Sequence, residues 1–137
     1  DPNNWGFLTN YGNSLLFAGK PEEALPLFQK VIRLNPRGPV FIYYNLGTAL
    51  RMTGRFEEAV SALKKGCQIA PDNLGGHILL TATYSMMGRE EEARAEAAEI
   101  LRINPKFSVD SLAKVRRYKD QSEEDKIADA LRKAGLK

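Results

Sequence analysis

A short turn motif occurs three times in this chain and constrains its fold more than any other feature. The copies are AGKPEEA at 18–24, TGRFEEA at 53–59 and MGREEEA at 87–93, with offsets of 35 and then 34 residues. The closing tripeptides LNP at 34–36, IAP at 69–71 and INP at 103–105 recur at the same offsets. Such self-similarity indicates one supersecondary unit that stacks on its own copies to bury an apolar core.

The central copy shows what each unit contains. Leu46, Ala49 and Leu50 recur at the spacing of one helical face, and the segment after Phe56 repeats that pattern. Gly54 lies between the two segments and is suited to ending the first helix, because glycine adopts the left-handed conformation without steric cost. The pattern predicts two antiparallel amphipathic helices per unit.

The phase of the three copies predicts an all-α chain. We expect six helices near 5–18, 21–34, 40–53, 56–69, 74–87 and 90–103. After Phe107 the repeat phase is lost, and two further helices are expected near 108–117 and 123–134. Leu112, Val115, Ile127 and Leu131 would cover the last repeat.

These residues resemble the tetratricopeptide repeat family, whose pattern includes Leu-Gly in the first helix, Ala and a large residue in the second, and a closing Pro. The matching pairs are Tyr11-Gly12, Leu46-Gly47 and Leu80-Thr81, followed by Ala24 with Phe28, Ala59 with Leu63 and Ala93 with Ala97. The third copy departs most, with Thr for Gly and Ala for the large residue. The resemblance implies a right-handed α-solenoid with repeats at 5–38, 39–73 and 74–107 and a helical cap at 108–137. Residues 1–4 resemble the tail of a preceding repeat, or form an N-terminal cap.

Composition limits the classes of function. The formal net charge is +3 and the basic residues alternate with acidic ones, which argues against a nucleic-acid surface. No apolar run has the length of a membrane span, and the N-terminal residues do not resemble a signal peptide. Cys67 is the single cysteine, which suits a reducing compartment and predicts a cytoplasmic location.

The sequence offers no catalytic, metal or cofactor set. His77 is the only histidine and occupies a position that the family fills with Trp, so a packed role is expected. Cys67 lies on an apolar helical face, and one Cys with one His cannot form a zinc site. The repeated Glu residues stand in the first turn of each second helix, where they favour the helix dipole. We therefore expect a protein that is not an enzyme and binds no cofactor.

The resemblance implies a concave groove lined by the first helices, which binds a protein or peptide. Mainly apolar side chains are expected there, together with Asn13 and Asn45, which can bond a peptide backbone. The predicted groove residues are Thr9, Asn13, Leu16, Phe17, Phe41, Tyr44, Asn45, Thr48, Arg51, Met52, Ile78, Leu79, Ala82, Ser85 and Met86. An alternative is that the chain's own tail, or a second copy in self-association, covers part of this surface.

One family subtype binds a terminal dicarboxylate with two groove Asn residues and several cations. Asn13 and Asn45 match the two Asn positions, but Thr9, Gly75 and Leu79 stand where that subtype has Lys or Arg. Charge-assisted capture of that kind is therefore not expected.

The C-terminal segment adds a rival interpretation. It is similar to the closing segment of bacterial tetratricopeptide regions, some of which follow a class III nucleotide cyclase domain. The chain would then be a regulatory or dimerising segment of a larger signalling enzyme. A basic cluster at 114–119, with Tyr118 inside it, is flanked by acidic residues and is expected to be a solvated helix side.

Overall fold

A computed structural model describes residues 4–115 and 117–137, which form eight α-helices. They are α1 (Trp5–Phe17), α2 (Pro21–Leu34), α3 (Phe41–Met52), α4 (Phe56–Ile69), α5 (Leu74–Met86), α6 (Glu90–Ile103), α7 (Val109–Ala113) and α8 (Ser122–Lys133). The all-α prediction is confirmed, and the six repeat helices begin and end within about two residues of the expected positions. The expected repeat tail at 1–4 lies outside the described residues except for Asn4, whose side chain caps α1 by accepting from Phe7 N at 3.0 Å.

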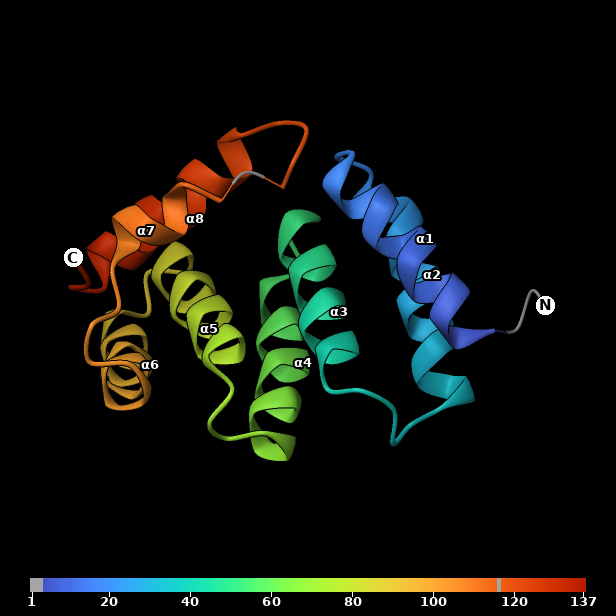
Figure 1. Ribbon diagram of the computed structural model, residues 1–137, viewed down its shortest axis with the longest axis horizontal. Helices are drawn as coiled ribbons and strands as arrows, with labels where there is room; N and C mark the ends of the chain where they lie inside the picture. Colours follow the sequence, from blue (N-terminus) through green and yellow to red (C-terminus); the bar gives the residue numbers. More distant parts are fainter. Residues whose placement is uncertain (1–3, 116) are drawn as a thin grey trace.

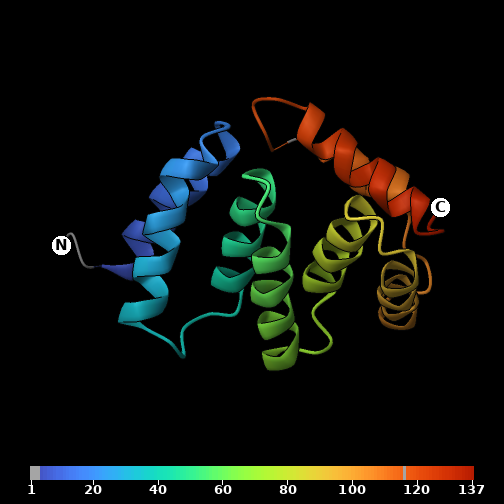
Figure 2. The ribbon, with the colours of Figure 1, turned by 180° about the vertical axis from the view of Figure 1, so that it is seen from behind.

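The helices form three hairpins arranged side by side, α1–α2, α3–α4 and α5–α6 (Figure 1). The two termini lie at opposite ends of this array, and the view from behind shows the same order (Figure 2). The α7–α8 segment crosses one edge of the array and packs mainly against α5. Among the described residues, no helix is both long and apolar enough to cross a membrane.

Each hairpin turns at a glycine with a positive φ, namely Gly19 (82°), Gly54 (80°) and Gly88 (76°). At the central turn, Gly54 N donates to Arg51 O at 3.0 Å and Arg55 N donates to Leu50 O at 2.8 Å. These two bonds satisfy carbonyls that the helix end leaves free, which is the Schellman arrangement. The same pair of bonds recurs at the other two turns and after α8 at Gly135.

A second repeated feature sets how closely the two helices of a hairpin pack. A Cβ on Gly12 would lie 2.6 Å from Phe28, and a Cβ on Gly47 would lie 2.6 Å from Leu63. The third hairpin has Thr81 and Ala97 at the equivalent positions, and both are buried. In the third hairpin the larger residue of the pair is therefore on the first helix and the smaller one on the second. This reverses the family pattern, but both positions stay buried.

The C-terminal segment differs from its prediction in two respects. The helix expected over 108–117 ends at Ala113, and Val115 is 44% exposed rather than covering the last repeat. The reason is that Tyr118 N, and Arg117 N beside it, donate to the Glu124 carboxylate instead of to helix carbonyls. Leu131 is fully buried as predicted, and Leu112 and Ile127 are partly buried.

Candidate functional site

The first helices of the three hairpins form one continuous face. Helix α3 contacts both α1 and α5, whereas contacts among the second helices α2, α4 and α6 are weaker in the described part of the chain. An array whose first helices lie closest together curves around them. We call the surface formed by α1, α3 and α5 the inner face.

Several predicted groove residues are buried within the array and already satisfied. The Thr9 hydroxyl donates to Trp5 O at 2.7 Å, and the Thr48 hydroxyl donates to Tyr44 O at 2.9 Å. Leu16 and Ala82 are also buried, with Ala82 in the same apolar cluster as Leu131 of α8. In this structure these side chains support the inner face from beneath.

Tyr44 does not project into the groove, contrary to our expectation. Its ring lies so close to Gly66 of α4 and Gly76 of α5 that a Cβ on either would be 2.4 Å or 2.7 Å from it. The ring is therefore packed between the second and third hairpins. Burial, with Cys67 as a lesser cause, raises the pKa of Tyr44 to about 12.

Part of the inner face is covered by the chain's own tail, residues 117–124, which we call the strap. In Figure 1 the connection between α7 and α8 reaches from the α5 side of the array towards the end of α1. The Tyr118 ring lies edge-on to Phe17, with ring centroids 5.1 Å apart and planes at 77°. Lys119 N donates to Phe17 O at 2.7 Å. Tyr118 also packs against the apolar cluster of the first two hairpins, and its burial raises its pKa.

The strap also reaches a buried cation. The Arg51 side chain is 3% exposed, and its Nη1 lies 3.3 Å from Glu123 Oε2. The same nitrogen is 4.0 Å from Met86 Sδ. Arg51 Nη2 is buried without a hydrogen-bond partner among the described residues, and so is Glu124 Oε2.

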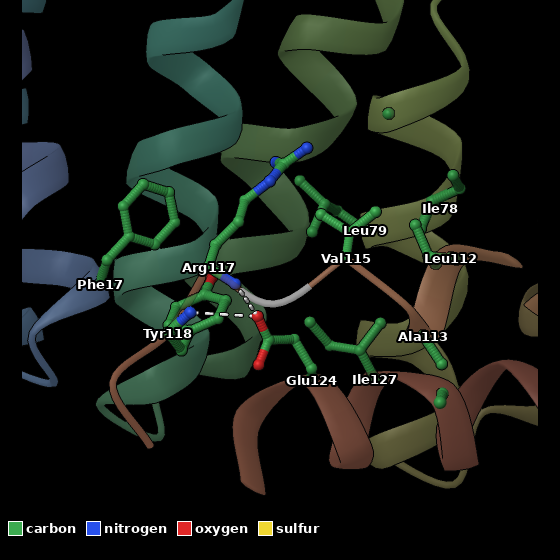
Figure 3. Close-up of a pocket in the computed structure, with 12 residues that line it drawn as sticks. Phe17, Ile78, Leu79, Leu112, Ala113, Val115, Arg117, Tyr118, Glu124 and Ile127 are labelled. Atoms are coloured by element: carbon green, nitrogen blue, oxygen red, sulfur yellow. Dashed lines mark hydrogen bonds between the residues drawn. The ribbon is translucent and has the colours of Figure 1, made fainter. Parts of the chain in front are cut away.

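A cavity of about 310 Å³ lies where the strap, α7 and α8 face α5. Figure 3 shows Ile78 and Leu79 on one side, with Leu112 and Ile127 across from them. The remaining lining residues are Phe17, Gly75, Ala113, Val115, Arg117, Tyr118, Glu124 and Ala128. The wall is mainly apolar, as predicted for the groove, but the tail supplies eight of the twelve lining residues.

The other part of the inner face, between α1 and α3, is not covered by the strap. Asn13 and Asn45 are half-buried, and neither side chain makes a hydrogen bond with another described residue. The Asn13 Oδ1 atom is buried, so it lacks a bond that buried polar groups normally have. Phe41, at the start of α3, is 42% exposed.

The predicted groove residues thus divide into three groups. Phe17, Arg51, Met86, Ile78 and Leu79 lie against the strap or the cavity, and Met52 packs against the same apolar cluster as Tyr118. Asn13, Asn45 and Phe41 lie outside it, and Ser85 is half-buried. The buried group is Thr9, Leu16, Tyr44, Thr48 and Ala82.

The lone Cys and His lie away from this surface. Burial, with the Glu96 carboxylate as a lesser cause, raises the pKa of Cys67 to about 11, which keeps the thiol protonated and unreactive. His77 is buried, as expected for a packed position. Its Nδ1 lies 2.6 Å from Glu96 Oε2, and its Nε2 lies 2.6 Å from Pro71 O.

Sequence reasoning missed Tyr118, Glu123 and Glu124 as residues of this site. The basic cluster around Tyr118 was expected to be a solvated helix side, yet Tyr118 is half-buried and no helix continues there. The available signal was Tyr118 itself, a single aromatic residue in a polar segment that no longer follows the repeat pattern. Its docking position could not be read from the sequence because Phe17 is about a hundred residues away.

Comparison with known proteins agrees with this architecture. Two family models, both described as tetratricopeptide repeat, match residues 7–72 and 50–114. The chain belongs to the tetratricopeptide repeat family. Over 111 residues it is 33% identical to an Hsp70-Hsp90 organising protein of Plasmodium falciparum, a match that covers 80% of this chain and 44% of that protein. A TPR repeat-containing thioredoxin, TTL4 of Arabidopsis thaliana, is 34% identical over 61% of this chain and 12% of its own length.

Solved structures share the fold. A MamA crystal structure superposes with a TM-score of 0.74 at 24% identity, covering 98% of this chain and 78% of that chain. The second TPR domain of human RPAP3, solved with an HSP70 peptide, gives a TM-score of 0.71 at 15% identity, covering 95% and 93%. The present chain spans less than half the length of the curated relatives described above, so it corresponds to one segment of them.

Proposed function

We propose that this chain is a non-catalytic scaffold that binds a partner protein or peptide on its inner face. The observation that carries the proposal is the pair Asn13 and Asn45, two half-buried amides without hydrogen-bond partners among the described residues, beside a row of apolar side chains. An amide has both donors and acceptors, so it can bond an extended peptide backbone whatever its sequence. Phe41, Ile78 and Leu79 would supply apolar contact area.

The relatives give this proposal its general form. Their printed names include proteins that organise Hsp70 and Hsp90 and a TPR domain solved with an HSP70 peptide. Capture of a chaperone's terminal dicarboxylate is not proposed for this chain. Thr9 is buried, and Gly75 and Leu79 line the cavity where that subtype has cations.

One finer expectation belongs to the same proposal. We infer a cytoplasmic setting from the single unpaired Cys67. The rival interpretation, a regulatory segment of a nucleotide cyclase, is favoured by no contact in the fold and by neither family model. We therefore do not carry it further.

The test begins with peptides selected from a random display library on the immobilised full chain. Binding of each selected peptide is then measured by calorimetry for the chain and for the Asn13→Ala/Asn45→Ala double variant. We expect at least tenfold weaker binding, because each lost amide leaves peptide groups unpaired at a cost of about 1–3 kcal/mol.

Two control variants test the position of the site. Gln68→Ala on the exposed side of α4, and a Lys114→Ala/Lys133→Ala change at exposed tail positions outside the strap, should leave binding unchanged. If the tail change abolishes binding while the two Asn changes do not, the inner face is the wrong site.

A further inference from the structure

We propose that the inner face selects partner segments that carry the chemistry of the strap: an aromatic residue, then a residue with a free backbone N–H, then a carboxylate about five positions after the aromatic. The inference rests on the proposed function and specifies its partner. The strap itself is the competing occupant, and it shows which groups the surface satisfies.

The aromatic position is defined by Tyr118. Its ring forms an edge-to-face pair with the Phe17 ring and packs against the apolar cluster formed by the first two hairpins. Edge-to-face pairs at this separation add to the burial of apolar area. An external Tyr, Phe or Trp would make the same contact once the strap has moved away.

The next position is defined by a backbone bond. Phe17 is the last residue of α1, so its carbonyl has no acceptor role inside the helix. Lys119 N donates to that carbonyl at 2.7 Å. Any residue except proline can donate in this way, so the rule for a partner is that proline cannot follow the aromatic.

The acidic position is defined by Arg51. A guanidinium that is 3% exposed needs a paired anion, because an isolated buried charge is costly. Glu123 engages Nη1, at 3.3 Å, and Nη2 has no hydrogen-bond partner in residues 4–115 and 117–137. A carboxylate that approaches Arg51 in the bidentate geometry would satisfy both nitrogens.

These contacts also explain why the strap can be displaced. Arg51 Nη2 and Glu124 Oε2 are buried without a hydrogen-bond partner in the described part of the chain, so the docking of the strap is incomplete. A partner carboxylate on Arg51 would remove the first defect, and release of the strap would return Glu124 to water. The apparent affinity of a partner is then its intrinsic affinity multiplied by the fraction of molecules in which the strap is undocked.

The experiment uses a fluorescent peptide with the sequence of residues 117–128 as a probe, and measures anisotropy with the full chain. A second chain carries Tyr118→Ala and Glu123→Gln, which weaken its own strap and leave the inner face intact. We expect this weakened-strap chain to bind the probe about tenfold more tightly than the unaltered chain. Equal affinities for the two chains would overturn the proposal.

Changes in the probe provide controls that cannot affect folding. Probes with Tyr118→Ala, Lys119→Pro or Glu123→Gln should each bind the weakened-strap chain about tenfold less tightly, while Gln121→Ala, at an exposed position between the motif residues, should have no effect. If the Pro and Gln probes bind as well as the parent, the stated chemistry is wrong.

Three further outcomes separate the proposals. If light scattering shows that the unaltered chain dimerises by exchanging straps, the occupant is a second copy and the inference of a foreign partner fails. If display-selected peptides depend on Asn13 and Asn45 but lack the aromatic–acid pattern, the proposed function stands and this inference fails. If no selected peptide depends on the inner face, both fail.

Discussion

At the scale of single residues, the close packing of the first two hairpins depends on a glycine of the first helix that faces a large side chain of the second helix. The Gly47 backbone touches Leu63 so closely that a Cβ would lie 2.6 Å away. We predict that Gly47→Ala destabilises the chain by about 1–3 kcal/mol, because the core is overpacked. Chemical denaturation of the variant measures the change in the free energy of unfolding.

A double variant shows whether contact with Leu63 is the cause. Adding Leu63→Ala should make the cost of Gly47→Ala smaller than in the parent, as coupling between contacting residues predicts. Gly75→Ala is the matched control, since Gly75 is exposed and the nearest atom is the flexible Asn73 side chain at 3.2 Å. Equal costs for Gly47→Ala in both backgrounds would refute the packing explanation.

His77 gives a prediction about pH. Burial opposes its charge, but the hydrogen bonds to Glu96 and Pro71 outweigh this and raise its pKa. The Pro71 carbonyl and the Glu96 carboxylate both accept, so both ring nitrogens must donate, which only the charged imidazolium can do. A raised folded-state pKa contributes stability below about pH 6.5 that is lost as pH rises through the folded pKa.

The melting temperature should therefore fall as pH rises from about 6.5 through that raised pKa, on account of this residue. Glu96→Gln should flatten this dependence, whereas Glu91→Gln, on the exposed side of α6, should not. A pH profile that Glu96→Gln leaves unaltered would mean that His77 is not charged in the folded chain.

At the scale of elements, α8 covers the end of the array. Leu131 is fully buried in a cluster that includes Leu80 and Tyr84 of α5 and Ile100 of α6. We predict that Leu131→Ala lowers the free energy of unfolding by about 2–5 kcal/mol, since truncation leaves a cavity. Val115→Ala should change it little, because Val115 is 44% exposed.

Removal of everything after Phe107 tests the element as a whole. The truncated chain should melt lower or self-associate, because the apolar side of α5 that faces α8 becomes exposed. A truncated chain that stays monomeric with the parent's melting temperature would show that α7 and α8 do not act as a cap.

The elements also show how far the sequence could predict this molecule. The three hairpins were predictable because their signals are local: Gly54 at a turn, Glu57 in a first turn, Pro71 at an end. Cover of part of the groove by the chain's own tail was an open alternative, but the contacts of the strap could not be predicted, because Tyr118 and Phe17 lie in distant segments and Glu124 accepts from backbone N–H groups at and just beyond the end of the expected helix. Tyr44 was misplaced because the missing side chains of Gly66 and Gly76 make room for its ring between hairpins.

At the scale of the whole molecule, the array presents a concave face that is partly free and partly covered by its own tail. We propose that the free part, with Asn13 and Asn45, binds a backbone of any sequence and that the covered part, with Arg51 and Phe17, selects side chains. Both parts include residues of α1 and α3, so a single extended segment could contact them together. Binding of such a segment and docking of the strap exclude each other at Phe17.

Hydrogen exchange with and without a bound display-selected peptide tests this account most directly. We predict slower amide exchange in the C-terminal half of α1 and in α3, with faster exchange at residues 118 and 119 as the strap leaves. Exchange in α2 and α6 should change little. Protection confined to the second helices α2, α4 and α6, with the strap amides unaltered, would contradict the assignment of the inner face as the binding surface.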